Sequence, residues 1–368
     1  MKCLVAFLAA MSSFASLAVA EDYDTSAGPV RVEPMLEGLE EPWSLAFLPD
    51  GDWLVTERDG RLLLVGEGQA REVAGVPQVV AVGQGGLLDV VVARDFGQSR
   101  RIFLSYAEPA ADGARTALAT GFLDPEEPRI DQLQVIFRMS AASASGHHFG
   151  SRIVEAPDGT LFLTIGERGH ATLAQDLDVD NGKVVRINPD GSIPADNPFA
   201  GGGGRPEIWS YGHRNPQGAA LDEEGRLWTV EHGARGGDEI NRPEPGRNYG
   251  WPVISYGRDY SGAKIGIGTE APGMEQPLFY WDPSIAPSGM MICSCRMFPQ
   301  WQGNVFVGSL KFDMISRLER DGDRIREAER LFDGTFGRIR DVREAPDGSI
   351  WFLSVVEGAA YRITPAGG

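Results

Sequence analysis

Two adjacent histidines, His147 and His148, stand in the stretch GHHFGSRIVEAPDGTLFLTIGERG, residues 146–169, just ahead of a turn and a strand-like run. The whole chain contains only 5 histidines, so a pair at one point indicates a specific use. A neutral imidazole can accept a proton near neutral pH because the ordinary pKa of histidine is about 6.5. The pair is therefore a candidate general base, and the alternative is a hydrogen-bonded loop feature without a catalytic role.

Other polar and cationic residues occupy the corresponding place in other parts of the chain, next to short apolar runs. They are Gln84, Arg214, Asn215, Lys311, Arg338 and Arg340. Isolated buried charges are costly, and arginine makes forked hydrogen bonds to carboxylates. A set of cations in one cleft therefore predicts a polycarboxylate ligand or cofactor. Taken singly, Arg338 and Arg340 could belong to an exposed edge strand, and Asn215 before Pro216 is typical of a turn.

A turn followed by a short apolar strand recurs along the chain and would position these residues. The copies are LPDGDWLVTE (48–57), the looser ARDFGQSRRIFLSY (93–106), APDGTLFLTIGE (156–167), LDEEGRLWTVE (221–231), FPQWQGNVFVGS (298–309) and APDGSIWFLS (345–354). Their turn glycines are Gly51, Gly97, Gly159, Gly225, Gly303 and Gly348. Asp-Gly supplies the positive dihedrals of a tight hairpin, and the Leu, Val, Phe and Trp residues that follow favour strands.

Six such units without helical connections predict an all-β fold, a six-bladed β-propeller. The alternative is an irregular β-sandwich in which similar turns coincide. In a propeller, loops from every blade meet at one end of the central channel. The histidines and the cationic residues are therefore expected to face a common opening.

The first 20 residues have the layout of a secretory signal peptide, with Lys2, an apolar middle and Ala18-Val19-Ala20 before Glu21. A membrane anchor is the alternative, but the apolar run is short and serines interrupt it. We expect a signal peptide at residues 1–20 and a single β-propeller catalytic domain at residues 21–368. The mature protein would then be periplasmic or secreted.

Charge and cysteine content limit the possible partners. The chain has 52 acidic and 34 basic residues, a formal net charge of −18, which argues against a nucleic-acid partner. No second long apolar segment is present, so we expect no membrane insertion. Cys293 and Cys295 remain after cleavage, and either a Cys-X-Cys bridge or two reduced, buried thiols would fit.

Longer motifs add a resemblance. The segments are EPWSLAFLPDG, GQGGLLDV, HHFGSR, TIGERG, GKVVRINPDGSIPADNPF, SYGHRNPQG, HGARGGDEIN, GRNYGWP, SIAPSG and GRIRDV, between Glu41 and Val342. With these segments the chain resembles the soluble, pyrroloquinoline-quinone-dependent glucose/sorbosone dehydrogenase family, and especially its shorter aldose sugar dehydrogenase members. GHRNPQG together with GGDEIN and NYGWP is the distinctive combination. The resemblance implies a six-bladed propeller that holds pyrroloquinoline quinone (PQQ) in its central cleft with a calcium ion beside it.

The resemblance also implies roles for individual residues. His148 falls at the place of the general base, which removes the anomeric hydroxyl proton of an aldose while hydride moves to the quinone. Arg214 would stabilise charge on the quinone carbonyl, and Asn215 and Gln84 would hold the cofactor. The remaining implied contacts are cofactor carboxylates to Lys311, Arg338 and Arg340, calcium to the carbonyls of Gly233 and Ala234, and a second calcium near Glu239 and the Tyr249 carbonyl. A solvated acidic turn is the alternative for Asp238 and Glu239.

Two positions depart from the pattern of the family. His147 stands where glucose dehydrogenases carry an acidic residue, so His147 is an alternative base as well as a wall of the cofactor pocket. Arg168 stands where a shorter polar residue often contacts the cofactor. The loops are shorter than in the long glucose-specific enzymes, which implies a more open pocket and broader acceptance of aldoses.

The expected partners are an aldose substrate and an external electron acceptor, because the chain has no Cys-X-X-Cys-His haem motif. We expect a monomer or dimer. One competing interpretation is a calcium-dependent propeller lactonase, which needs several acidic and amide side chains converging on one metal. The other is a non-catalytic secreted propeller that binds a carbohydrate or a protein.

Overall fold

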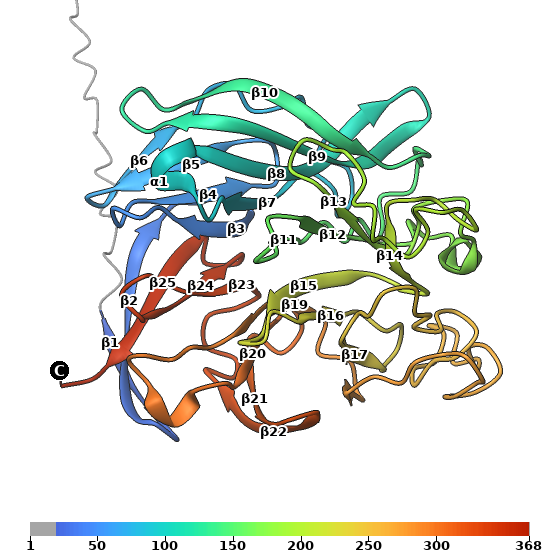
Figure 1. Ribbon diagram of the computed structural model, residues 1–368. Coiled ribbons are helices and arrows are strands. Elements are labelled where there is room, and N and C mark those ends of the chain that lie inside the picture. Colours follow the sequence, from blue (N-terminus) through green and yellow to red (C-terminus); the bar gives the residue numbers. More distant parts are fainter. Residues whose placement is uncertain (1–19, 368) are drawn as a thin grey trace, which may run out of the picture.

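The computed structural model describes residues 20–367 as an almost entirely β-structured chain, with six sheets arranged as the blades of a propeller (Figure 1). The predicted all-β, six-bladed β-propeller is confirmed. The signal peptide expected at residues 1–20 lies, except for Ala20, outside the described residues. Among the described residues, no helix combines the length and apolar character needed to cross a membrane.

Five blades are four-stranded antiparallel sheets whose strands follow one another in the chain. The first contains β3 (Pro42–Phe47), β4 (Trp53–Glu57), β5 (Leu62–Gly66) and β6 (Gln69–Glu72), and the second β7 (Leu87–Val92), β8 (Arg101–Ala110), β9 (Gly113–Asp124) and β10 (Arg129–Arg138). The third contains β11 (Ile153–Glu155), β12 (Leu161–Ile165), β13 (Lys183–Ile187) and β14 (Ile208–Tyr211). The fourth contains β15 (Pro216–Leu221), β16 (Leu227–Glu231), β17 (Asp238–Asn241) and β18 (Phe279–Trp281), and the fifth β19 (Pro287–Ile292), β20 (Val305–Ser309), β21 (Ile315–Asp321) and β22 (Arg324–Leu331).

The sixth blade joins the two ends of the described chain. Its five strands run in the order β1 (Glu21–Thr25), β2 (Gly28–Glu37), β25 (Ala359–Pro365), β24 (Ile350–Ser354) and β23 (Ile339–Glu344). In Figure 1 the blue β2 lies beside the red β25, and the register pairs Val32 with Ile363. This pairing joins the first strands of the described chain to its last blade and so closes the ring.

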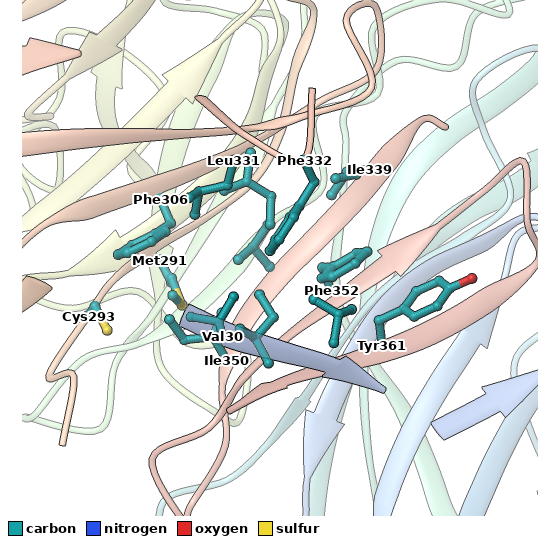
Figure 2. Close-up of a cluster of buried hydrophobic side chains, with 14 of the residues drawn as sticks. Val30, Met291, Cys293, Phe306, Leu331, Phe332, Ile339, Ile350, Phe352 and Tyr361 are labelled. Carbon is teal, nitrogen blue, oxygen red and sulfur yellow. The ribbon is translucent and has the colours of Figure 1, made fainter. Parts of the chain in front are cut away.

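A cluster of buried apolar side chains packs the sixth blade against the fifth (Figure 2). Val30 of β2 lies in it with Phe306 of β20 and Phe352 of β24, each at most 1% exposed. Phe352 stacks on Tyr361 of β25 with ring centroids 5.0 Å apart. Burial of large side chains contributes about 1.5–3 kcal/mol each, so this cluster stabilises the closure.

The second strand of most blades is buried along its whole length. Strands β4, β12, β16, β20 and β24 contain only buried residues, because each of these strands lies inside a sheet that is covered by a neighbouring blade on either face. Continuous apolar runs such as LFLTI therefore form strands here without alternation of polar and apolar residues.

The turn between the first and second strand of each blade carries the repeated glycine. Gly51, Gly159, Gly225, Gly303 and Gly348 have positive φ angles between 74° and 101°. The looser copy differs, because Gly97 lies in the short helix α1 (Phe96–Ser99) rather than in a tight turn. The other short helices are the 3₁₀ segments η1 (Ala171–Gln175) and η2 (Pro299–Trp301).

The two cysteines left open by the sequence, Cys293 and Cys295, form a disulfide directly after β19. Both residues are buried in the cluster between the fifth and sixth blades.

Candidate active site

Strand direction decides which residues meet at the mouth of the channel. Neighbouring strands in a blade are antiparallel, so the loop before the first strand and the loop after the second strand emerge at the same end. His148 precedes β11, and Glu167 and Arg168 follow β12. The mouth therefore collects two loops from each blade, and the sequence prediction concentrated on the first of them.

A cavity of about 1520 Å³ opens at this end. It is lined by loops from the first, second, fourth, fifth and sixth blades. The predicted site residues that line it are Gln84, Asn215, Gly233, Ala234, Lys311, Arg338 and Arg340. Residues brought together from such distant parts of the chain make this cavity the candidate active site.

The three cations of the cavity wall that the sequence predicted lack acidic partners. Lys311 and Arg338 are exposed, and neither they nor Arg340 form an ion pair with any residue between 20 and 367. Arg340 donates from Nη1 to Oε1 of Gln217 (3.1 Å) and lies over the Trp43 ring at 5.8 Å. Burial, together with the nearby charges of Arg338 and other arginines, lowers the pKa of Arg340 to about 9. These uncompensated positive charges suit an anionic ligand.

Neither His147 nor His148 is among the residues that line the cavity, but His148 is bonded to Gln84, which does line it, and is held on both sides. Its backbone N–H donates to Oε1 of Gln84 at 2.8 Å, and its φ angle is 52°. Its Nδ1 atom lies 2.7 Å from Oε2 of Glu167. Because a carboxylate accepts hydrogen bonds, Nδ1 carries the proton, and Nε2 presents a lone pair.

The environment keeps the His148 ring neutral. Burial lowers its pKa below the ordinary value, Arg214 and His147 lower it further, and Glu167 opposes the shift. A neutral ring with its lone pair on Nε2 is the form that a general base requires at neutral pH. His147 differs because it is exposed and its ring has no carboxylate partner among the described residues.

Arg168 is fully buried and does not line the cavity. Its guanidinium donates to the carbonyls of Ala114 (3.0 Å), Ser145 (2.6 Å) and His147 (3.0 Å) and lies 3.6 Å from the Phe149 ring centroid. Without a carboxylate hydrogen-bonded to it, burial lowers its pKa to about 10. This placement differs from the cofactor contact expected from the sequence, because two of the acceptors, Ser145 and His147, belong to the histidine segment and the third, Ala114, lies on β9.

Arg214 and Asn215 follow β14 and project beside His148. The guanidinium of Arg214 lies over the Trp251 ring at 5.2 Å, and its Nη1 donates to the His232 carbonyl at 3.3 Å. Its Nε is buried without a partner among the described residues. Oδ1 of Asn215 accepts from the N–H of Gly150 at 3.1 Å. Arg214 thus retains unused donors, as a site for an anionic or carbonyl oxygen requires.

His232 is a further histidine in the cavity wall. Its Nε2 lies 2.6 Å from the Pro287 carbonyl and must donate to it, so Nδ1 carries the lone pair. Burial and the nearby Arg214 lower the pKa of His232 to about 3, and the ring stays neutral. Sequence reasoning noted this residue only as a neighbour of Gly233.

Asp238 anchors the segment Gly233–Ala234. Its carboxylate accepts hydrogen bonds from the N–H of Gly233 (2.8 Å) and from Ile285 (2.7 Å), which fixes this segment against the loop before β19. Asp238 is therefore a buried, fully bonded residue and not a solvated acidic turn.

A second, smaller cavity of about 20 Å³ adjoins the first and has room for one water molecule or ion. Glu231, Glu239, Tyr249 and Arg214 line it. Burial and the like charge of Glu231 raise the pKa of Glu239 to about 8. Among residues 20–367, no group of three or more His, Cys, Asp or Glu side chains is placed to hold a metal. A cation here would rely on backbone carbonyls in addition to Glu239.

A buried ionic network lies behind the main cavity. Arg152 contacts Asp89 (2.9 Å) and Asp341 (3.3 Å), and Arg343 contacts the same two carboxylates. Trp43 separates it from the mouth, with Arg152 at 4.4 Å on its ring and Arg340 at 5.8 Å. The network links inner strands of several blades and so supports the floor of the site.

Sequence reasoning missed the roles of Glu167 and Trp43, although both lie in motifs that it used, TIGERG and EPWSLAFLPDG. The signal that could have identified Glu167 is its position relative to the strands of its blade. Glu167 directly follows a second strand, and that end of the strand returns to the mouth beside the first strand of the same blade.

Comparisons with known proteins match most of the chain. The family model described as Glucose / Sorbosone dehydrogenase matches residues 39–362. Aldose sugar dehydrogenase YliI of Escherichia coli is 47% identical over 345 residues, which cover 91% of this chain and 93% of that protein. The crystal structure of the soluble aldose sugar dehydrogenase from Escherichia coli in its apo form has a TM-score of 0.88 and 45% identity, covering 91% of this chain and 99% of that one. The PQQ-bound aldose sugar dehydrogenase of Streptomyces coelicolor has a TM-score of 0.76 and 28% identity, covering 91% and 98%.

Proposed function

Because the chain belongs to the glucose/sorbosone dehydrogenase family, we propose that it is a PQQ-dependent dehydrogenase that oxidises the anomeric carbon of aldoses to lactones. The observation that carries this proposal is the pair of His148 and Glu167, with 2.7 Å between Nδ1 and Oε2, next to a cavity in which Lys311, Arg338 and Arg340 have no acidic partner among residues 20–367. A base and an anion site side by side are what oxidation of a sugar hydroxyl with an anionic cofactor needs.

The cavity residues fit PQQ. Lys311, Arg338 and Arg340 would pair with its carboxylates, since these cations have no other anionic partner among residues 20–367. Gln84 and Asn215 would hydrogen-bond the ring system, with His147 as part of the wall. When bound, PQQ supplies the acceptor for the two electrons and the hydrogen leaving the anomeric carbon.

His148 is the proposed catalytic base. Its Nε2 would take the proton of the anomeric hydroxyl, and the Glu167 carboxylate would stabilise the imidazolium that forms. His147 is the less suitable base because no carboxylate within residues 20–367 fixes its tautomer.

Arg214 would act by electrostatic stabilisation. Its buried, unsatisfied Nε and its remaining donors point to an oxygen ligand close to His148, where negative charge develops during oxidation. For Arg168 we propose a different task from the cofactor contact expected from the sequence. It is a positioning residue that holds the segment Ser145–His147 and thereby orients the base.

Calcium would be held in two places. The carbonyls of Gly233 and Ala234 would bind one ion beside the cofactor, in a segment that Asp238 keeps rigid. Glu239 and the carbonyl of Tyr249 would bind a second, structural ion in the small cavity, where it would offset the repulsion between Glu239 and Glu231.

We further propose a periplasmic or secreted location, an external electron acceptor and a monomeric or dimeric state. The apolar leader of the sequence supports export.

A reconstitution assay tests the proposal. Purified protein is mixed with PQQ and calcium, and then with glucose or another aldose and an artificial electron-accepting dye. Dye reduction that requires PQQ, calcium and sugar together is the expected result. Absence of both PQQ binding by calorimetry and dye reduction over a panel of aldoses would contradict it.

A further inference from the structure

Two arginines face each other on the rim of the main cavity. Arg235 follows β16, and Arg258 lies in the long connection between β17 and β18. Their backbones form an antiparallel bridge, in which the N–H of Arg235 donates to the carbonyl of Arg258 at 2.8 Å and the N–H of Arg258 donates back at 3.1 Å. Both residues are exposed and line the cavity.

The electrostatics of this pair are unfavourable in the protein alone. Like charges placed directly opposite on paired strands repel each other. Neither side chain forms an ion pair or a hydrogen bond with another described residue. Asp282 lines the same cavity but forms no ion pair within the described part of the chain, and Asp259 accepts a hydrogen bond from the N–H of Ser261 instead. An anion bound between the guanidinium groups would remove the repulsion.

Aromatic side chains stand next to the pair. Tyr256 stacks on Tyr280 with ring centroids 4.1 Å apart and lines the cavity together with Tyr260, which is 70% exposed. Tyrosines of this kind present an apolar face and a hydroxyl, which suits a ligand that carries both C–H and hydroxyl groups. The rim therefore combines surfaces for a sugar ring with two free cations.

The rim pair is separate from the cations assigned to the cofactor. Lys311, Arg338 and Arg340 come from the fifth and sixth blades, whereas Arg235 and Arg258 come from loops of the fourth. The volume of about 1520 Å³ also exceeds that of most small-molecule pockets, roughly 300–1,000 Å³. The cavity has room for a ligand group beyond the cofactor and a simple hexose.

We propose that Arg235 and Arg258 form a subsite for an anionic substituent of the sugar, so that the enzyme prefers aldoses that carry a phosphate or carboxylate away from the anomeric carbon. This inference rests on the proposed dehydrogenase function and names the substrate class of its site. Tyr256 and Tyr260 contact the sugar ring, and the two guanidinium groups bind the anion.

The test compares glucose with glucose 6-phosphate and glucuronate, all of which have a free anomeric hydroxyl, in the reconstituted holoenzyme. At low ionic strength, kcat/KM is expected to be higher for the charged sugars, and the preference should shrink with added salt. In the double variant Arg235→Gln/Arg258→Gln, the ratio of kcat/KM for a charged sugar to that for glucose should fall about tenfold or more. A preference for a phosphate or for a carboxylate is distinguished by whether the ratio of kcat/KM changes for glucose 6-phosphate or for glucuronate.

The matched control is Arg326→Gln on β22, an arginine whose side chain is 70% exposed and which pairs with Glu319 outside the cavity. It removes one positive charge, half of the change in the double variant, and should leave the ratio unchanged. Calorimetry of glucose 6-phosphate binding to the protein without PQQ gives a readout that does not need turnover. The wild type should bind it more tightly than the double variant.

An unchanged ratio and unchanged binding in the double variant would overturn the inference. So would a selective loss of PQQ affinity, which would assign the pair to the cofactor. A selective loss of turnover with an acidic redox protein as acceptor would assign it to protein docking and equally overturn the inference. Failure of the wild type to oxidise any of the three sugars would count against the proposed function itself, while sugar-phosphate binding would still test the rim.

Discussion

Nδ1 of His148 lies 2.7 Å from Oε2 of Glu167, and the two residues belong to the two loops that one blade sends to the mouth. Glu167 also accepts from the N–H of Gly169, and its carbonyl accepts from Nδ2 of Asn181 at 3.0 Å, so the carboxylate is fixed before any ligand binds. A fixed carboxylate determines both the tautomer and the direction of the imidazole lone pair.

Glu167→Gln should shift the pH dependence and reduce the rate. Burial lowers the pKa of His148 and Glu167 raises it, so loss of the carboxylate should lower this pKa further. The acidic limb of kcat/KM, which reflects protonation of the base, should therefore lie below the ordinary histidine value near 6.5 in the wild type and lower still in the variant. The maximal kcat should fall about 10- to 100-fold. A pH–rate profile of both proteins tests this prediction. An acidic limb that moves to higher pH in Glu167→Gln would contradict the pairing of His148 with Glu167.

Arg168→Lys should affect turnover through the histidine segment. A lysine cannot reach three carbonyls in the fork geometry of a guanidinium, so His148 should lose its orientation and kcat should fall more than KM rises. Added guanidinium ion should partly restore kcat in Arg168→Ala.

The control for this prediction is Arg317→Lys, because Arg317 is another buried arginine but pairs with Glu329 in the fifth blade. It should lower the melting temperature without changing the ratio of kcat to KM. If Arg168→Lys, like Arg317→Lys, lowers only the melting temperature and leaves the ratio of kcat to KM unchanged, Arg168 has a structural role and does not position the base.

Arg340→Gln should weaken the cofactor more than the sugar. Its guanidinium has no acidic partner among the described residues and is partly buried, so it gains most from a bound carboxylate. Loss of a charged hydrogen bond of this kind predicts about a 10- to 100-fold increase in the Kd of PQQ. Calorimetry with PQQ and a KM measurement with saturating PQQ separate the two effects. A larger change in sugar KM than in PQQ Kd would remove Arg340 from the cofactor site.

Calcium should stabilise the protein through Glu239. Ligands that bind only the folded state raise its melting temperature, and a cation in the small cavity would also relieve the repulsion between Glu239 and Glu231. The melting temperature should therefore rise with calcium and fall with a chelator. In Glu239→Gln this response should become smaller, whereas Glu329→Gln, outside the cavity, should keep it. An identical calcium response in both variants would contradict the structural site.

The local part of the fold could be predicted from the sequence, because each Asp-Gly turn and the apolar run after it are contiguous in the chain. The closure of the propeller ring could not be predicted, since the pairing of Val32 with Ile363 joins distant segments and neither segment carries a turn motif. Gly97 shows the limit of the local signal, because Asp95 and Phe96 begin a helical turn at the position where the other blades have a hairpin.

The site was partly predictable for a similar reason. Residues just ahead of first strands, such as Gln84 and Asn215, were identified and do line the cavity. Gly233, Ala234 and Lys311, which follow second strands, were also identified and line the cavity. The contacts of Arg168 and Glu167 after β12 depend on side-chain direction, which the sequence does not contain. Arg168 and Glu167 are adjacent in the chain, yet one bonds backbone carbonyls of a neighbouring loop and the other bonds the base.

The most direct measurement is single-turnover and steady-state oxidation of an aldose by reconstituted wild type, His148→Ala and His147→Ala, together with the Kd of PQQ for each. Loss of the base should lower kcat about 10²- to 10⁴-fold in His148→Ala, with PQQ still bound. His170→Ala, an exposed histidine of the same region, serves as the control for loss of a ring. Full turnover in His148→Ala with PQQ bound would contradict the account, and a loss confined to His147→Ala would transfer the role of base to that residue.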